Sequence, residues 1–289
     1  MRNVLKMLSC LFFCFLVSDG FAESQIDGID CIYLINLDRR PDRLASSNAE
    51  LAKYDVHPQR FSAIDGKTIP FETLTGIGLP FTQEMRCSRK AFTPSGNGKL
   101  ERVFLDCIAE NMIVFSEGTS VGAVGCALSH ISVLRDAYAA GYQTIWVLED
   151  DIGVRQDPHV LAQLITSLDS LTGGNWDILY TDMDEFGEAS RAVNSFWWLW
   201  RPDSTLFDTK VFTERKRINK DFIRIGGRAR THSMIIRRSG MKKILDHIEN
   251  HHLYLPIDHE LSFVSNILLY MTSYPVVTFT NRFSSDIER

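Results

Sequence analysis

The chain has 289 residues, of which 45% are hydrophobic and 23% are charged, and its formal net charge at pH 7 is −5. This mild acidity argues against non-specific nucleic-acid binding, so we expect no nucleic-acid partner. The length is sufficient for one large α/β domain with a substantial core, and no internal repeat or low-complexity tract divides it.

Residues 1–22 have the pattern of a targeting segment. Arg2 and Lys6 form a basic start, and residues 7–17 are almost wholly apolar. This run is too short to span a bilayer comfortably as a helix. We therefore expect a signal peptide cleaved after Ala22, with an uncleaved anchor as the alternative. Either reading predicts an exported or membrane-associated protein, periplasmic in a bacterium or lumenal in a eukaryote. Residues 23–289 would then form the single folded domain.

Four cysteines remain after such cleavage: Cys31, Cys87, Cys107 and Cys126. Their spacing matches no zinc pattern. An exported protein could pair them, but Cys31 and Cys126 lie in apolar stretches and fit buried thiols equally well. The pairing stays open.

The domain begins with a predicted strand, residues 29–36, followed by a predicted helix, residues 41–54. A strand that leads through polar residues into a helix N-terminus is a favourable place for a phosphate. Arginines at this point could add charge-assisted bonds, or could simply be solvated: Arg39, Arg40 and Arg43.

Residues 57–64 predict a second strand, which ends at the turn Asp65-Gly66. An acidic residue after the second strand suits a ribose hydroxyl, although no glycine-rich fingerprint precedes it here. Residues 66–117 are rich in glycine and proline, and we expect irregular structure, either a flap or an ordinary insertion.

Residues 122–140 predict a helix that Gly141 ends. Cys126 and His130 lie on one face of it. A Cys/His nucleophile pair is conceivable there, but no third residue is in view to orient it. A structural or pocket-lining His130 is therefore favoured.

An apolar run, residues 145–148, ends abruptly in Glu149, Asp150 and Asp151. Such a run is typical of a buried strand in a parallel sheet, and ligands bind just beyond the carboxyl ends of such strands. Three adjacent like charges repel one another unless a cation or hydrogen-bond donors compensate. Mg²⁺ and Mn²⁺ prefer oxygen ligands and often hold phosphates. The pattern predicts a metal–diphosphate site, with a solvated acidic turn as the alternative.

The same pattern then recurs. After a predicted helix at 158–171, a strand at 176–180 leads to Asp182, Asp184 and Glu185. Two such strands separated by one helix predict a βαβ unit with a shared acidic rim. The repetition strengthens the metal or acid–base interpretation.

Residues 186–230 form an insertion in which Trp197, Trp198 and Trp200 precede a basic stretch. Aromatic rings bind sugars and arginines bind anions, which makes this a candidate acceptor surface, although tryptophans are more often core residues. The remaining predicted elements are a strand at 231–237, a helix at 239–251, a helix from Pro256 to about Tyr270 and a strand at 276–280.

Several blocks in series resemble glycosyltransferase family 25, the group of the lipooligosaccharide and collagen galactosyltransferases. They cover most of residues 29–260, and NLDRRPDR, GCALSH and LEDD in that order are specific. The blocks are 32–43 (IYLINLDRRPDR), 61–66 (FSAIDG), 122–130 (GAVGCALSH), 147–151 (VLEDD), 176–180 (WDILY), 231–240 (THSMIIRRSG) and 256–258 (PID).

The resemblance implies a GT-A-type fold, a Rossmann-like nucleotide-sugar-binding sheet flanked by helices. It also implies a metal-dependent hexosyltransferase that uses Mn²⁺ or Mg²⁺. The donor would be a UDP-sugar, typically UDP-galactose or UDP-glucose, and the acceptor a glycan, lipooligosaccharide or glycoprotein. Such an enzyme inverts the anomeric centre.

Carried over residue by residue, the resemblance also implies site roles. The metal ligands would be Glu149, Asp151 and His232, and Asp150 could assist. The donor-binding residues would be Asn36, Arg39, Arg43, Asp65, His130 and Asp150. Inverting displacement needs a carboxylate to deprotonate the acceptor hydroxyl. The candidates are Asp182, Asp184 and Asp258, with Asp258 slightly favoured.

Two alternatives come from other functional classes. One is a carbohydrate- or surface-binding protein that retains the fold without turnover. The other is a metal-dependent phosphodiesterase or nucleotide-sugar hydrolase that uses the same carboxylates, which product analysis would distinguish.

Overall fold

The computed structural model describes residues 25–96, 98–182, 199–204, 212–280 and 285–287. Several residues named in the sequence predictions therefore lie outside the described residues: the targeting segment, Asp184 and Glu185 of the acidic rim, and the tryptophans Trp197 and Trp198. Within the described part, no helix combines the length and the apolar character needed to cross a membrane.

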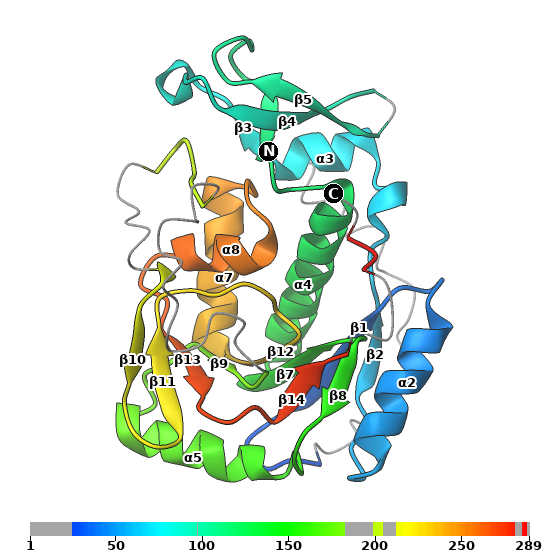
Figure 1. Cartoon of the computed structure of the whole chain (residues 1–289), viewed down its shortest axis with the longest axis vertical. Helices are drawn as coiled ribbons and strands as arrows, with labels where there is room; N and C mark the ends of the chain where they lie inside the picture. Colours follow the sequence, from blue (N-terminus) through cyan, green and yellow to red (C-terminus); the bar gives the residue numbers. More distant parts are fainter. Residues whose placement is uncertain (1–24, 97, 183–198, 205–211, 281–284, 288–289) are drawn as a thin grey trace.

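A mixed sheet, with eight strands among the described residues, forms the centre of the molecule (Figure 1). In spatial order the strands are β10 (Arg215–Arg217), β11 (Phe222–Ile225), β13 (Leu269–Thr272), β9 (Ile178–Tyr180), β12 (Ser233–Arg237), β7 (Thr144–Glu149), β1 (Cys31–Asn36) and β2 (Gln59–Ser62). The predicted α/β class is confirmed. The expectation of a parallel sheet is wrong at two places: β12 runs antiparallel to both of its neighbours, β7 and β9, and β11 runs antiparallel to β10 and β13.

Helices cover both faces of this sheet, and its central strands, such as β7 and β9, are accordingly apolar on both sides. In β7, Ile145 and Val147 belong to the core shared with α4 (Val121–Ala140) and α7 (Arg238–His251). Trp146 and Leu148 belong to the opposite core, shared with α2 (Pro41–Ala52) and α5 (Val160–Thr172). Alternation along a doubly buried strand explains why the sequence shows a continuous apolar run.

Local signals define the ends of α4, the longest helix in the described part. The Ser120 side chain accepts a hydrogen bond from the Ala123 N–H (3.1 Å) at its start. Gly141 ends it with a φ of 85°, a backbone conformation that glycine adopts without steric cost. The helix therefore begins and ends close to the predicted residues.

Residues 66–117 are more regular than predicted. They contain two 3₁₀ turns (Gly66–Thr68 and Gln83–Met85), α3 (Phe71–Ile77) and a small sheet with β3 (Leu79–Pro80), β6 (Ile113–Ser116), β4 (Lys90–Pro94) and β5 (Leu100–Phe104). Their apolar side chains, Phe81 and Val114 among them, form a separate core with Tyr254 and Leu255. The strands are short and depend on this distant partner, so local pattern did not reveal them.

The predicted helix from Pro256 to Tyr270 is wrong over most of its length. α8 spans only Ile257–Glu260 and a 3₁₀ turn follows at Leu261–Phe263. Asn266 then adopts a positive φ of 56°, and β13 pairs between β9 and β11. Pairing inside the sheet outweighs local helix preference. The predicted strand at 276–280 is β14 (Val277–Phe279), which pairs with β8 (Ile152–Val154).

Candidate active site

The three carboxylates at the end of β7 point in different directions because side chains alternate along a strand. Glu149 lies on the α4 side, where its Oε1 is 3.1 Å from Nε2 of His130. Asp150 lies on the other side and accepts a hydrogen bond from Nδ2 of Asn36 at the end of β1 (2.7 Å). Alternation thus separates charges that are adjacent in the sequence.

Arg43 of α2 holds the next two carboxylates together. Its Nη2 donates to Oδ2 of Asp151 (2.6 Å), and its Nε lies 3.1 Å from Oδ1 of Asp150. The Ser47 hydroxyl also donates to the Asp150 carbonyl (2.8 Å). Asn36, Arg43 and Asp150 therefore form an internal support beneath Asp151. Their predicted contact with a nucleotide stays a prediction.

The antiparallel strand β12 brings His232 to the same edge. Ser233 pairs with Leu148 of β7, and its carbonyl accepts the Thr181 N–H after β9 (3.1 Å). The residue before Ser233 therefore lies beside the carboxyl ends of β7 and β9. His232 Nε2 is 3.6 Å from Oδ1 of Asp151.

On its other side, His232 Nδ1 is 3.6 Å from Oδ2 of Asp182. Both distances exceed a hydrogen bond but allow charge attraction. We call these five residues the acidic edge: Glu149, Asp150, Asp151, Asp182 and His232.

Part of the acidic edge has the donor set of a divalent-cation site. One ligand atom each from Glu149, Asp151 and His232 lie within 4.8 Å of one another. Among the described residues, Oδ1 of Asp151 and Nδ1 of His232 are buried without a hydrogen-bond partner. A buried polar atom without a partner is costly, and carboxylate oxygens and imidazole nitrogens are metal ligands. The arrangement fits a bound divalent cation.

Burial and charge together shift the pKa values of these groups. Burial raises the pKa of Asp150 to about 6 and also raises that of Asp151, despite the nearby cationic groups. Burial raises the pKa of Glu149 too, but the His130 hydrogen bond and the His232 charge outweigh it and lower that pKa to about 2. Burial lowers the pKa of His232, but its acidic neighbours outweigh this and raise it to about 9. The edge therefore attracts positive charge.

The arginines at the start of α2 contact a residue close to the C-terminus. Arg39 donates to Oδ2 of Asp65 and to Oδ1 of Asp286, both at 2.6 Å. Arg40 also pairs with Asp286, and Arg43 Nη1 lies 3.2 Å from it. All three arginines predicted at a phosphate-binding turn therefore converge on one carboxylate.

The described candidates for the general base differ in accessibility. Asp258, in the first turn of α8, accepts the backbone N–H groups of Arg230 (2.7 Å) and His259 (2.9 Å), and its side chain is 19% exposed. Asp182 has no exposed side-chain surface and pairs with Arg228 at 2.8 Å. An acceptor hydroxyl can therefore approach Asp258 more readily than Asp182.

Sequence reasoning missed several residues that complete the site. Thr231 donates its hydroxyl proton to Oε1 of Glu149 (2.6 Å), and Phe279 of β14 stacks on the His232 ring with centroids 5.5 Å apart. Arg228 and Asp286 supply the ion pairs described above. Only Thr231 had a local signal, its position next to His232. The others reach the site through contacts distant in sequence.

The four described cysteines are free thiols. Burial, followed by the nearby carboxylates, raises the pKa of Cys126 well above its ordinary value. A nucleophilic cysteine needs a lowered pKa, so this environment argues against the Cys126–His130 nucleophile pair.

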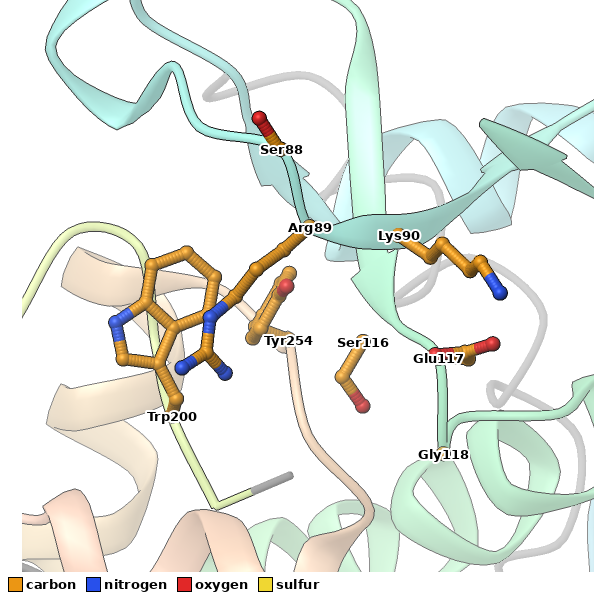
Figure 2. Close-up of a pocket in the computed structure, with 8 residues that line it drawn as sticks. All are labelled: Ser88, Arg89, Lys90, Ser116, Glu117, Gly118, Trp200 and Tyr254. Atoms are coloured by element: carbon orange, nitrogen blue, oxygen red, sulfur yellow. The ribbon is translucent and has the colours of Figure 1, made fainter. Parts of the chain in front are cut away.

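A separate pocket of about 330 Å³ lies between β4, the end of β6 and the segment 199–204 (Figure 2). The guanidinium carbon of Arg89 lies 4.6 Å from the centre of the Trp200 ring, which meets Tyr254 edge-on at 6.3 Å. Lys90 and Glu117 also line this cavity. Trp200 is the described tryptophan of the predicted aromatic and basic surface, whose described basic residues include Arg215 and Arg217 on the edge strand β10 and do not line this pocket.

Comparison with known proteins gives one family. A family model described as glycosyltransferase family 25 (LPS biosynthesis protein) matches residues 29–261. An Aedes aegypti protein named glycosyltransferase 25 family member is 26% identical over 154 residues, which are 53% of this chain and 21% of that protein.

Two mammalian proteins match a similar share of this chain. Human procollagen galactosyltransferase 2 is 24% identical over 155 residues, 53% of this chain and 20% of that protein. Mouse inactive glycosyltransferase 25 family member 3 is 25% identical over 156 residues, 53% of this chain and 22% of that protein. The matched segment thus covers only 20–22% of the length of these relatives.

Proposed function

The chain belongs to glycosyltransferase family 25, and from this premise we propose that it transfers a hexose from a UDP-sugar to a glycan or protein acceptor. The proposed reaction depends on Mn²⁺ or Mg²⁺ and inverts the anomeric centre on a GT-A-type sheet. One observation carries the proposal. Glu149, Asp151 and His232 meet at the carboxyl end of β7, and Oδ1 of Asp151, which lies 3.6 Å from His232 Nε2, is buried without a hydrogen-bond partner among the described residues.

Glu149, Asp151 and His232 would hold the cation, which supplies electrostatic stabilisation of the charge that develops on the leaving diphosphate. The chain contributes by fixing these ligands. Arg43 orients Asp151 through a 2.6 Å hydrogen bond. Thr231 orients Glu149 from the opposite element. Such supporting contacts hold a metal ligand in its productive rotamer.

Arg39 and Arg40 would bind the diphosphate. They lie where β1 leads into α2, and the positive end of a helix dipole favours an anion there. Both arginines now pair with the Asp286 carboxylate. A diphosphate carries more negative charge than one carboxylate, and it would take the place of Asp286 on these side chains.

Asp258 would act as the general base. As the acceptor oxygen bonds to the anomeric carbon and the bond to the UDP oxygen breaks, Asp258 would take the hydroxyl proton. The two backbone N–H groups of Arg230 and His259 fix the carboxylate in place. Asp182 stays a weaker candidate because Arg228 neutralises it in a buried ion pair.

The pocket at Trp200 would bind the acceptor. An aromatic ring packs against the apolar face of a sugar, and Arg89 and Lys90 add positive charge. This combination fits a saccharide with carboxylate or phosphate substituents, the kind found in a lipooligosaccharide. Trp200→Ala is expected to raise the acceptor KM and to leave UDP-sugar binding unchanged, which kinetics with each substrate varied in turn would measure.

The test of the proposed function is a panel of UDP-sugars with the purified protein, with and without Mn²⁺. We expect one UDP-sugar to raise the melting temperature only when the metal is present, and to release UDP when acceptor is added. Free sugar formed without acceptor would identify a hydrolase instead. Binding without any turnover would identify a catalytically inactive protein, as the name of the mouse relative says of that protein. No response to any nucleotide sugar would overturn the proposal.

A further inference from the structure

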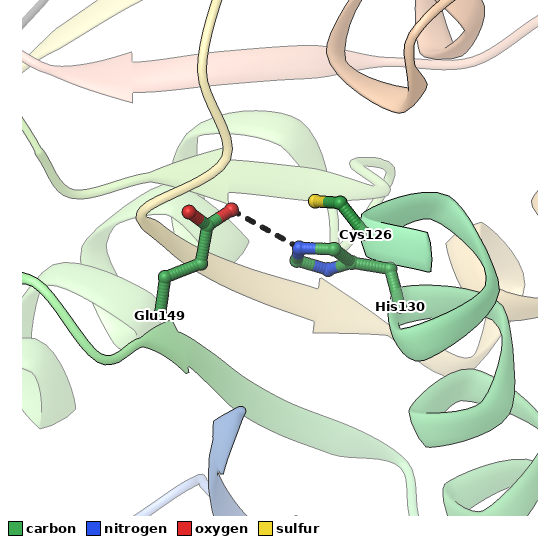
Figure 3. A group of neighbouring side chains, drawn as sticks. All are labelled: Cys126, His130 and Glu149. Atoms are coloured by element: carbon green, nitrogen blue, oxygen red, sulfur yellow. Dashed lines mark hydrogen bonds and ion pairs between the residues drawn. The ribbon is translucent and has the colours of Figure 1, made fainter. Parts of the chain in front are cut away.

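A second group of potential metal ligands lies next to the acidic edge. Cys126 and His130 are one helical turn apart on α4, and both face Glu149 at the end of β7 (Figure 3). One ligand atom from each of the three side chains lies within 4.8 Å of the other two. In this group, His130 Nε2 is 3.1 Å from Glu149 Oε1.

We propose that Cys126, His130 and Glu149 form a Zn²⁺ site, and that Zn²⁺ bound there antagonises the catalytic cation because both sites need Glu149. The binding site stands on its own geometry. The antagonism rests on the proposed function.

The ligand types separate the two sites by metal preference. A thiolate, an imidazole and one carboxylate suit Zn²⁺, whereas Mn²⁺ and Mg²⁺ favour sites richer in oxygen. Zn²⁺ bonds of about 2.0–2.3 Å require ligand atoms about 3.3–3.7 Å apart, so the cluster needs only a small side-chain movement. Three protein ligands leave a fourth position for water, an open coordination that structural zinc sites with four protein ligands lack.

The surroundings hold this ligand set in place and leave it accessible. Thr231 donates to Oε1 of Glu149, the contact typical of a residue that orients a metal ligand. Cys126 is partly exposed, and the Glu149 side chain is 21% exposed, so a cation can enter from solvent. Cys126 would release its thiol proton to solvent when Zn²⁺ binds.

Glu149 connects the two sites because it belongs to both ligand groups, the one with Cys126 and His130 and the one with Asp151 and His232. When the Glu149 carboxylate binds Zn²⁺ beside Cys126, its oxygens are less available to ligate a cation beside Asp151. Two divalent cations this close would also repel each other. Zn²⁺ at the first site therefore weakens Mn²⁺ binding at the second.

The test uses the full metal-free protein and two spectroscopic readouts that need no turnover. Co²⁺ replaces Zn²⁺ in such sites, and a thiolate-to-cobalt charge-transfer band reports ligation by Cys126. Zn²⁺ affinity is measured by calorimetry. The electron paramagnetic resonance signal of free Mn²⁺, recorded with UDP present, reports Mn²⁺ release on addition of Zn²⁺.

We expect the wild type and Cys107→Ser, a control at an exposed cysteine, to show the cobalt band and to release Mn²⁺ when Zn²⁺ is added. Cys126→Ser should lose the band, bind Zn²⁺ at least about tenfold more weakly and retain Mn²⁺. Circular dichroism confirms that this near-isosteric variant folds.

A missing band in the wild type, or an unchanged band in Cys126→Ser, overturns the site. Zn²⁺ binding without Mn²⁺ release overturns the antagonism. Absence of sugar transfer alone contradicts the proposed function and leaves the zinc result valid.

Discussion

The acidic edge and a second cluster, around Glu260, both bury carboxylates beside a histidine. They differ in how many of their buried polar atoms have hydrogen-bond or ion-pair partners within the protein. In the Glu260 cluster, which comprises Arg201, His247 and Glu260, one Glu260 oxygen pairs with Arg201 and with His247 (2.8 Å). The other accepts the backbone N–H groups of Tyr254 (3.1 Å) and Leu255 (2.8 Å). Both oxygens of Glu260 therefore have protein partners.

Arg201 is satisfied as well. It donates to Asp203 at 3.0 Å and to the carbonyls of His251 (2.6 Å) and His252 (3.2 Å). The cluster ties the segment 199–204 to the end of α7 and to α8. In the acidic edge, by contrast, Asp151 and His232 retain buried atoms with no hydrogen-bond partner among the described residues. The comparison teaches that a complete set of protein partners indicates a structural cluster, whereas an incomplete one indicates a place for a ligand.

The largest effect is expected when the satisfied cluster is broken. Glu260→Ala removes the carboxylate that Arg201 and His247 share and leaves the backbone N–H groups of Tyr254 and Leu255 buried without a partner, and it should lower the free energy of unfolding by about 3–5 kcal/mol. Urea unfolding followed by circular dichroism measures this. Asp246→Ala removes an exposed pair with Lys242 on α7 and should change little. Equal effects in the two variants would show that burial does not distinguish these pairs.

A substitution in the acidic edge should instead reduce activity and leave the free energy of unfolding unchanged or higher. Asp151→Asn removes one of several repelling charges, so stability is retained or rises, while kcat/KM for sugar transfer falls by about 10²–10³-fold. UDP-release kinetics and thermal melts measure the two effects. Asp157→Asn, at an exposed carboxylate in the loop after β8, is the control and should keep full activity. Destabilisation comparable to that of Glu260→Ala would mean that the acidic edge is structural.

Acid should lower the contribution of the Glu260 cluster to the free energy of unfolding. Burial raises the pKa of Glu260, but the charge of Arg201 and the hydrogen bond to His247 outweigh it, and the folded-state pKa lies below 4.5. The unfolded chain therefore binds the proton first, so the stabilisation is complete above pH 4.5 and is lost as the pH falls through the folded-state pKa.

The free energy of unfolding should thus fall as the pH drops below 4.5, and it should fall less in Glu260→Gln. Urea titrations at a series of pH values measure both slopes. Parallel slopes in the two proteins would contradict the assignment.

The smallest effect concerns Arg39 and Arg40 of the proposed donor site. Asp286→Asn removes the carboxylate that pairs with Arg39 and Arg40, and UDP affinity should rise about two- to fivefold at low salt and less at high salt. Calorimetry measures it. Asp42→Asn removes a more exposed partner of Arg40 and is the matched control. Weaker UDP binding in Asp286→Asn would instead make Asp286 a residue that positions the arginines.

The sequence by itself determined the elements with strong local signals. Residues 145–148 form a strand because an apolar, partly β-branched run suits a doubly buried position, and α4 is bounded by Ser120 and Gly141. It also identified the family and the order of its motifs. Charge repulsion among Glu149, Asp150 and Asp151 predicted that a cation or hydrogen-bond donors compensate them, although not how the three divide their contacts.

Only the tertiary structure decided which charges are satisfied. The antiparallel direction of β12 places His232 beside Asp151, and Asp286 reaches Arg39 across 247 positions of the chain. Strand β13 forms where local preference predicted a helix, because its neighbours β9 and β11 supply backbone partners. Local pattern reports what a residue prefers, but partners distant in sequence determine whether a buried charge is neutralised. That difference separates the Glu260 cluster from the acidic edge.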